Sequence, residues 1–158
     1  MRILFLGDVV GISGCSKLTS NLLNEIDRKK IDFVIVNGEN AATQGVGLTK
    51  EICKDFFNCG VDVITTGNHV WDKKDIMKFI DNEKRLLRPK NLFEPAPGKG
   101  FQVYNTPENI RIGVLNLMGN VFMKKCDDVF EASKKFIEKY KFKDDYDVLV
   151  VDFHGEIT

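Results

Sequence analysis

The chain has 158 residues, of which 43% are hydrophobic and 29% are charged. This composition is typical of a globular domain that is large enough to bury a core, and we expect a single domain over residues 1–158. The 23 basic and 23 acidic residues cancel to a formal net charge of zero, so charge gives no support for nucleic-acid binding. No apolar run approaches the ~18 residues of a membrane helix, and residues 3–6 are too short for the core of a signal peptide. We therefore expect a cytoplasmic protein that does not enter a membrane.

Up to residue 81 the sequence alternates between short apolar runs and amphipathic segments. The predicted elements of this half are strands at residues 2–7, 32–37 and 62–66 and helices at residues 17–29, 49–58 and 72–81. The first helix rests on the spacing of Leu18, Leu22 and Ile26, which puts them on one helical face. Thr49 and Asp72 are the expected N-caps of the other two helices. The continuous apolar run of the second strand is typical of a parallel strand that is buried on both faces.

The second half begins with a connection at residues 88–100 that is rich in proline and glycine. The predicted elements after it are strands at residues 101–105, 110–117 and 147–153 and a helix at residues 128–141. A polar turn at residues 106–109 joins the first two of these strands into a hairpin. The pattern as a whole predicts an α/β fold with a mostly parallel sheet and a hairpin extension.

Acidic and amide side chains follow the first two predicted strands at the point where each strand ends. Asp8 follows the first strand, and Glu39 and Asn40 follow the second. Ligands of open α/β folds bind at such strand ends. A carboxylate has two oxygens and can bridge two cations, while the Asn40 amide offers a neutral oxygen. The alternative is that these residues only form turns, for which Gly, Asn and Asp are common.

The only two histidines of the chain also fall at predicted strand ends. Asn68 and His69 follow the third strand, and His154 follows the last one. Asn68 offers an oxygen to a metal, His154 offers a ring nitrogen, and His69 is placed to donate a proton, because an imidazole titrates near neutral pH. Asp152 and Glu156 flank His154, and their roles stay open. These hard oxygen and imidazole ligands predict a divalent-metal hydrolase.

Other features of the sequence compete with this interpretation. Gly7, Gly11 and Gly14, with Glu39 beyond them, loosely resemble a dinucleotide-binding pattern, but the spacing departs from G-x-G-x-x-G. Such a nicotinamide-dependent oxidoreductase would also have no use for the histidines. Trp71 is expected to pack beneath its loop rather than line a substrate pocket. The four cysteines lack C-x-x-C spacing, so we expect reduced thiols rather than a zinc site.

The residues at the strand ends stand within longer segments that match a known family. The segments are MRILFLGDVVG, DFVIVNGENAATQGVGLT, GVDVITTGNHVWDKK, RLLRP and VVDFHGEIT. In this order the chain resembles the YmdB-like branch of the calcineurin-type metallophosphoesterases over essentially its whole length. The resemblance implies an α/β sandwich of mixed, largely parallel sheets that are flanked by helices.

The resemblance also implies a site and an activity. Its members carry two divalent metal ions, iron or manganese, and hydrolyse phosphodiesters such as cyclic nucleotides. The implied ligands of the first metal are Asp8, Glu39 and Asn40, with Glu39 bridging; those of the second are Asn68 and His154; the implied proton donor is His69. A hydroxide activated by the two metals would attack phosphorus. The larger superfamily usually has a histidine where Val10 stands, and this branch uses the Asn40 position instead.

One departure from the family concerns the end of the chain. The family continues past the DFH motif into a segment with a G-T-H-T-H motif, whose two histidines complete the metal sites. We therefore expect this chain to be the N-terminal portion of the domain, incomplete at its C-terminus. A catalytically inactive fragment that binds metal or nucleotide without turnover is the alternative function. RNA as a substrate and a homo-oligomer are both left open by the sequence.

Overall fold

The computed structural model describes residues 1–93 and 95–156, and its elements follow the predicted alternation. The strands are β1 (Ile3–Leu6), β2 (Phe33–Asn37), β3 (Val63–Thr65), β4 (Phe101–Asn105), β5 (Arg111–Met118) and β6 (Val148–His154). The α-helices are α1 (Gly11–Lys29), α2 (Lys50–Asn58) and α3 (Val129–Lys139), and two short 3₁₀ helices are η1 (Lys74–Lys78) and η2 (Ile80–Asn82). Each predicted strand is therefore present within one or two residues of its expected bounds.

The strands form two sheets of three strands each. In the first sheet β1, β2 and β3 are parallel, in that order. In the second sheet β4 is antiparallel to β5, and β5 is parallel to β6. The hairpin is thus not an extension of the first sheet but belongs to a second one, because β6 pairs with β5. The predicted class, an α/β sandwich of mixed and largely parallel sheets flanked by helices, is confirmed.

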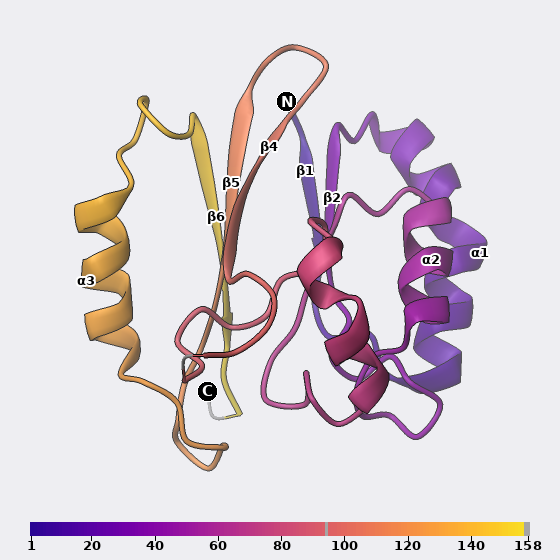
Figure 1. The fold of residues 1–158 in the computed structure, drawn as a ribbon. Coiled ribbons are helices and arrows are strands. Elements are labelled where there is room, and N and C mark those ends of the chain that lie inside the picture. The colour runs from indigo at the N-terminus through magenta and orange to yellow at the C-terminus, as the bar shows by residue number, and fades with distance from the viewer. Residues whose placement is uncertain (94, 157–158) are drawn as a thin grey trace.

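The two sheets lie face to face between layers of helix. Figure 1 shows α1 and α2 outside the first sheet and α3 outside the second. Between the sheets lies an apolar cluster to which β2 contributes Phe33 and Ile35 and β5 contributes Ile112 and Val114. Alternate residues of β2 point the other way, toward the helices, as the two-residue period of a strand requires. This alternation explains why β2 is apolar at every position except its last.

Helix α3 covers the outer face of the second sheet through aromatic packing. Phe136 is 1% exposed and lies among Leu115 and Leu117 of β5 and Tyr146, which precedes β6. Its ring meets that of Phe101 on β4 with centroids 4.7 Å apart and nearly perpendicular planes. Edge-to-face pairs of this kind stabilise a core beyond the area that they bury. One side chain of α3 therefore packs against residues of β4, of β5 and of the segment that precedes β6.

Two of the predicted helices differ from expectation. Helix α1 begins at Gly11, six residues earlier than predicted, where a left-handed φ of 59° lets the Gly11 N–H donate to the Asn40 carbonyl. The segment predicted as a helix at residues 72–81 forms the 3₁₀ helices η1 and η2 instead. The expected cap, Asp72, is held by other side chains and does not bond to this segment's first turn. Thr49, by contrast, caps α2 as predicted.

Two further predictions from the sequence concern the thiols and membrane helices. All four cysteines are free thiols, as predicted. Within residues 1–93 and 95–156, no helix is both long enough and apolar enough to cross a membrane.

We predict that Phe136→Ala destabilises the protein by about 3–5 kcal/mol, because it leaves a cavity beneath α3. Phe130, on the same helix, is 80% exposed and provides the matched control, since Phe130→Ala removes little buried area. Urea unfolding followed by circular dichroism measures both variants. Equal losses of stability in the two variants would contradict the assigned role of Phe136.

Candidate metal centre

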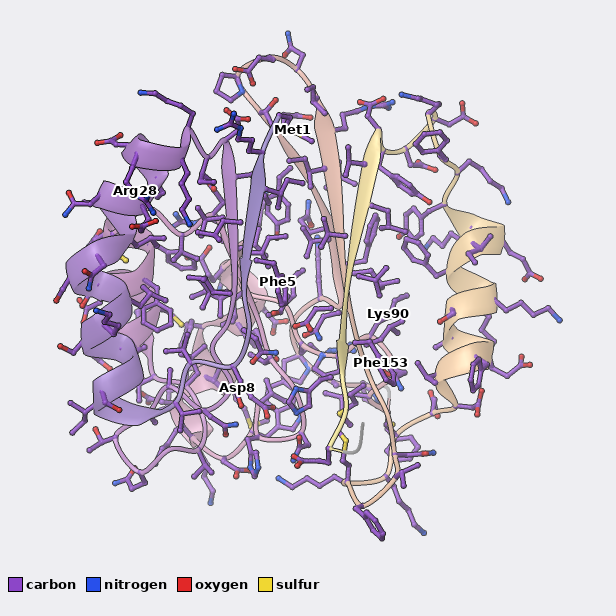
Figure 2. All side chains as sticks on the ribbon, turned by 180° about the vertical axis from the view of Figure 1, so that it is seen from behind. Met1, Phe5, Asp8, Arg28, Lys90 and Phe153 are labelled. Carbon is purple, nitrogen blue, oxygen red and sulfur yellow. The ribbon has the colours of Figure 1, made fainter. Side chains whose placement is uncertain are left out.

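The carboxyl ends of four strands bring the predicted site residues to one edge of the sandwich. The residues concerned are Asp8 after β1, Glu39 and Asn40 after β2, Asn68 and His69 after β3, and His154 at the end of β6. Seen from behind in Figure 2, Asp8 and Phe153 lie at the same end of the two sheets, and both line one small cavity. The ends of the parallel strands therefore meet as the sequence predicted. We call this set of six residues the rim.

Glu39 lies at the centre of the rim, with no solvent-exposed surface. Its Oε1 is 2.8 Å from Nε2 of His154 and accepts a hydrogen bond from Nδ2 of Asn40 at 3.3 Å. Its Oε2 accepts a hydrogen bond from the backbone N–H of His69 at 3.2 Å. Nε2 of His154 also lies 3.0 Å from Oδ1 of Asn68. One carboxylate thus connects the ends of β2, β3 and β6.

The Asn40 amide is held on one side only. Its Nδ2 donates to Oδ2 of Asp8 at 2.7 Å and to Glu39. Its Oδ1 is buried and has no hydrogen-bond partner in the structure. A buried acceptor without a partner costs free energy, and native proteins rarely leave one. A buried amide oxygen without a partner, on a side chain that neighbours the carboxylates of Asp8 and Glu39, is suited to a cation.

Gly67 explains how the rim residues approach one another so closely. A Cβ atom at this position would lie under 3.0 Å from Oε2 of Glu39 and from the ring of His154. Only glycine leaves room for both side chains. Gly67 was visible in the sequence as the first residue of the Gly67–Asn68–His69 segment, but its steric role depends on β6, which is distant in the chain.

His69 is held by a contact that the sequence did not reveal. Its Nδ1 is 2.7 Å from Oδ2 of Asp72, and Oδ1 of Asp72 accepts a hydrogen bond from Nζ of Lys124 at 2.7 Å. Burial alone would raise the pKa of Asp72, but the bonds from Lys124 and His69 outweigh it and lower that pKa. With Nδ1 engaged, Nε2 is the ring nitrogen of His69 that is left to act at the rim. A carboxylate three residues after a histidine is the only local signal for this pair.

The electrostatics of the rim favour added positive charge. Burial raises the pKa of Asp8, although the hydrogen bond from Asn40 opposes this. Burial would lower the pKa of His154, but the hydrogen bond and charge of Glu39, helped by Asp152 and Asp8, raise it instead. Both shifts have the cause expected of acidic groups gathered away from water.

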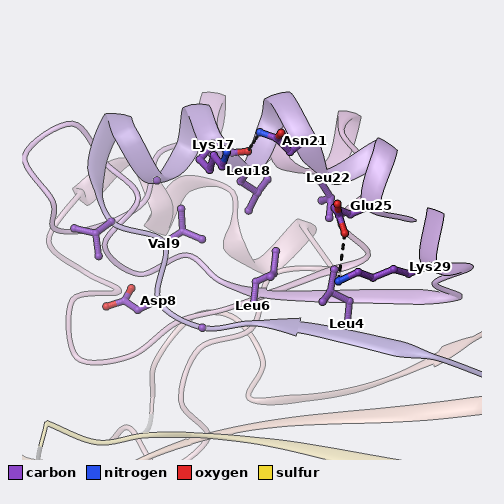
Figure 3. A pocket seen from close by; sticks show the side chains of 13 residues that line it. Leu4, Leu6, Asp8, Val9, Lys17, Leu18, Asn21, Leu22, Glu25 and Lys29 are labelled. Carbon is purple, nitrogen blue, oxygen red and sulfur yellow. Dashed lines mark hydrogen bonds and ion pairs between the residues drawn. The ribbon is translucent and has the colours of Figure 1, made fainter. Parts of the chain in front are cut away.

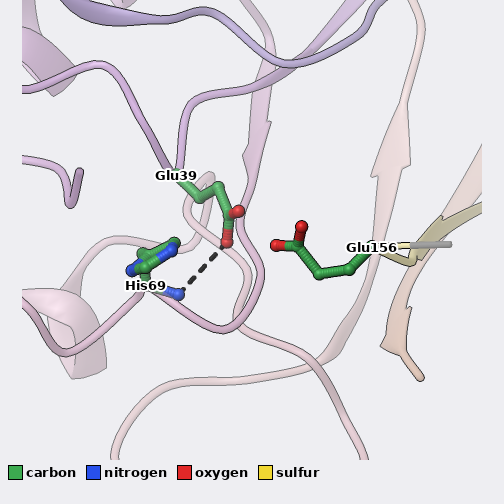
Figure 4. Close-up of side chains that lie close together, drawn as sticks. All are labelled: Glu39, His69 and Glu156. Carbon is green, nitrogen blue, oxygen red and sulfur yellow. Dashed lines mark hydrogen bonds between the residues drawn. The ribbon is translucent and has the colours of Figure 1, made fainter. Parts of the chain in front are cut away.

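The roles of Asp152 and Glu156 are resolved in part. Oδ2 of Asp152 accepts a hydrogen bond from Nδ2 of Asn37 at 2.9 Å, so its carboxylate faces the interior between the sheets. Glu156 turns toward the rim. One ligand atom each of Glu39, His69 and Glu156 lies within 4.8 Å of the others, and Figure 4 shows the two carboxylates facing one another. A group of this composition is able to hold a metal ion.

Two hollows border the rim. The smaller, of about 320 Å³, is lined by polar groups that include Asp8, Asn40, His154 and Glu156. The larger, of about 610 Å³, runs between β1 and α1, and Figure 3 shows Asp8 at one end of it and apolar side chains along it. Because Glu39 is fully buried and engaged by His154, it is not free to bind the ribose of a dinucleotide. This argues against the oxidoreductase alternative.

A two-sheet α/β sandwich with acid, amide and imidazole groups at its rim is the arrangement that the sequence predicted for a protein of the phosphoesterase class. The family model described as YmdB-like protein matches residues 4–158 of the chain. The chain belongs to the YmdB-like family, as its sequence segments predicted.

Curated and solved relatives agree with this assignment. The chain is 41% identical over 158 residues to a 2′,3′-cyclic-nucleotide 2′-phosphodiesterase of Bacillus subtilis (strain 168). It is 35% identical to a hypothetical protein from Thermus thermophilus, whose crystal structure superposes with a TM-score of 0.89, and 34% identical to a phosphatase from Mycoplasma pneumoniae, with a TM-score of 0.87. Each structural match covers 99% of this chain.

The relatives are longer than this chain. The match covers all of the chain but 58% of the Bacillus subtilis protein, and it covers 59% and 56% of the two solved chains. The positions of all six rim residues lie within the matched region, since the matches extend over essentially every residue of the chain.

We predict that Gly67→Ala lowers the affinity of the chain for Mn²⁺ at least tenfold, because the added methyl group displaces Glu39 or His154. Gly7→Ala is the matched control: Gly7 also stands at a strand end beside a rim residue, but nothing lies within 4 Å of the Cβ position. Isothermal titration calorimetry with Mn²⁺ measures both variants. An unchanged affinity in Gly67→Ala would show that the close approach at Gly67 does not matter for metal binding.

Proposed function

We propose that the protein is a metal-dependent phosphodiesterase that acts on cyclic nucleotides, with 2′,3′-cyclic nucleotides as the first substrates to test. The observation that carries this proposal is the buried Glu39 carboxylate, which the ends of β2, β3 and β6 share, beside an Asn40 oxygen without a partner. The substrate class follows the name of the Bacillus subtilis relative. The chain spans 58% of the length of that relative, so we extend the relative's substrate class to this chain from the matched part alone.

The residues present fit a pair of divalent ions. Asp8, Glu39 and Asn40 would hold the first ion; the Asn40 amide would turn so that Oδ1, which has no partner, takes the place of Nδ2 beside the two carboxylates. Glu39, Asn68 and His154 would hold the second, with Glu39 shared by both. Carboxylate, amide and imidazole groups together suit Mn²⁺ and Fe²⁺. When bound, the ions supply positive charge that activates water and stabilises negative charge on the phosphoryl oxygens.

The remaining groups of the site orient and protonate the substrate. In this proposal His69 donates a proton from Nε2 to the departing oxygen, since Asp72 engages Nδ1. Lys124 in turn holds Asp72, so the ring of His69 has a fixed direction. The polar cavity of about 320 Å³ gives the phosphodiester access from the side of Asp8 and Glu156.

Binding of metal or nucleotide without turnover is the second candidate function. The observation that favours it is the length of the relatives, each of which has more than 40% of its chain outside the shared part. Any metal-ligating residue in the unmatched part of the relatives has no counterpart among residues 1–158 of this chain. The two candidates differ in turnover and agree in metal binding.

Hydrolysis of bis-p-nitrophenyl phosphate tests the proposed function directly. We expect release of p-nitrophenol only after loading with Mn²⁺ or Fe²⁺ under anaerobic conditions. Glu39→Ala should reduce the rate at least 100-fold, whereas Glu138→Ala, an exposed glutamate on α3, should leave it unchanged. Metal binding without release of p-nitrophenol, measured by calorimetry on the same samples, would establish the second candidate instead.

We predict that His69→Ala keeps Mn²⁺ affinity within twofold of the unchanged protein but slows hydrolysis of 2′,3′-cyclic AMP by about 10²–10⁴-fold, the usual contribution of a proton donor. The loss on bis-p-nitrophenyl phosphate should be smaller, because p-nitrophenolate departs without being protonated. Steady-state kinetics on the two substrates make the comparison. Equal losses on both would remove His69 from this role.

A further inference from the structure

The proposed ligands come from two different sheets. Glu39 and Asn68 follow strands of the first sheet, whereas His154 ends β6 of the second. No backbone ladder joins β2 to β6 in the described residues, and the isolated bridges from Ile64 to Leu86 and from Leu87 to Lys99 do not include the ends that carry the ligands. The apolar contacts between the sheets are non-directional. The polar side chains that cross between the sheets at this end have a defined direction.

Asn37 connects the ends of β2 and β6 directly. It is 3% exposed, and it is the last residue of β2. Its Nδ2 donates to Oδ2 of Asp152 on β6 at 2.9 Å, and its Oδ1 accepts from the backbone N–H of Glu39 at 3.2 Å. The same side chain therefore holds the second sheet with one atom and the backbone of Glu39 with the other.

Asn116 makes the corresponding connection between β5 and the end of β3. It has no exposed surface, and it pairs with Asp152 in the register of β5 and β6. Its Oδ1 accepts from the backbone N–H of Thr66 at 3.0 Å, and its Nδ2 donates to the carbonyl of Asp152 at 3.4 Å. Both asparagines thus reach across the interface, and both bond to Asp152.

Three residues of this network have the same sequence spacing from the proposed ligands. Asn37, Thr66 and Asp152 each stand two positions before a ligand, and the ligands in the same order are Glu39, Asn68 and His154. Asp152 and His154 both lie in β6, where residues two apart project to the same side. On β6 the network therefore lies next to the ligand, and at Asn37 it bonds to the backbone N–H of the ligand Glu39 itself.

We propose that Asn37, Asn116 and Asp152 form an inter-sheet clamp that positions Glu39 against His154 for metal binding. The proposal deepens the proposed function and rests on its metal centre. The three are positioning residues, because they act through the ligands rather than on substrate. Groups that hold metal ligands in place commonly contribute 10–100-fold to metal affinity.

A reciprocal exchange of Asn37 and Asp152 tests the clamp. Asn37→Leu removes both bonds of Asn37, and Asn37→Asp alone sets two carboxylates against each other. In the double variant Asn37→Asp/Asp152→Asn, the amide at position 152 donates to the carboxylate at position 37, which still accepts from the Glu39 N–H. We expect Mn²⁺ affinity to fall at least tenfold in each single variant and to return to within threefold of the unchanged chain in the double variant.

A second readout does not depend on metal. The Glu39 amide is protected by Oδ1 of Asn37, so its hydrogen exchange, followed by nuclear magnetic resonance in the metal-free chain, should speed up at least tenfold in Asn37→Leu and recover in the double variant. Phe136→Ala is the control for general loss of stability, since Phe136 packs on the opposite face of the second sheet. It should leave Mn²⁺ affinity within twofold of the unchanged chain.

The outcomes separate the clamp from the proposed function. If the unchanged chain binds no Mn²⁺, the metal centre fails, and exchange at Glu39 still decides whether the clamp exists. The clamp is overturned if Asn37→Leu leaves Glu39 exchange unchanged, or if the double variant recovers neither exchange nor affinity. It is also overturned as a positioning device if Phe136→Ala lowers Mn²⁺ affinity as much as Asn37→Leu does.

Discussion

Burial of the Glu39 carboxylate is the constraint on which the rest of the rim depends. A carboxylate without exposed surface is costly unless opposite charge and hydrogen bonds surround it. Glu39 finds these in His154 from β6, in the Asn40 amide and in the backbone of His69. Three separate strand ends must therefore arrive together, and Gly67 must carry no side chain for them to do so.

The sequence predicted the strand ends because the signal for them is local. Apolar runs followed at once by polar residues placed Asp8, Glu39 and His154 correctly at one edge, and the glycine before Asn68 marked the third strand end. The predicted start of α1, residue 17, was wrong. The helix begins at Gly11, whose N–H donates to the carbonyl of Asn40, 29 residues further along the chain. No local pattern could indicate that contact.

Contacts between distant parts of the chain account for the other misses. Asp72 has the sequence position of a helix cap, but its carboxylate is taken by His69 and Lys124, and the expected helix becomes two 3₁₀ turns. The strands form two sheets because β6 pairs with β5. The apolar periodicity of a strand does not specify which strand it pairs with. Asn37 was predicted as the last residue of a strand, and no local pattern indicates that its side chain reaches a carboxylate 115 residues away.

Apolar and polar contacts between the two sheets have different roles: the apolar contacts stabilise the sandwich, and the polar contacts orient its end. The cluster around Ile35 and Val114 holds the sheets together without specifying their register, because apolar contacts have no preferred direction. The hydrogen bonds of Asn37 and Asn116 have defined geometry, and they lie at the end of the sandwich where the ligands emerge. A fold that is stabilised in one place and oriented in another can change its core packing without moving its ligands. Relatives about 35% identical in sequence superpose on nearly all of this chain, as such a division would permit.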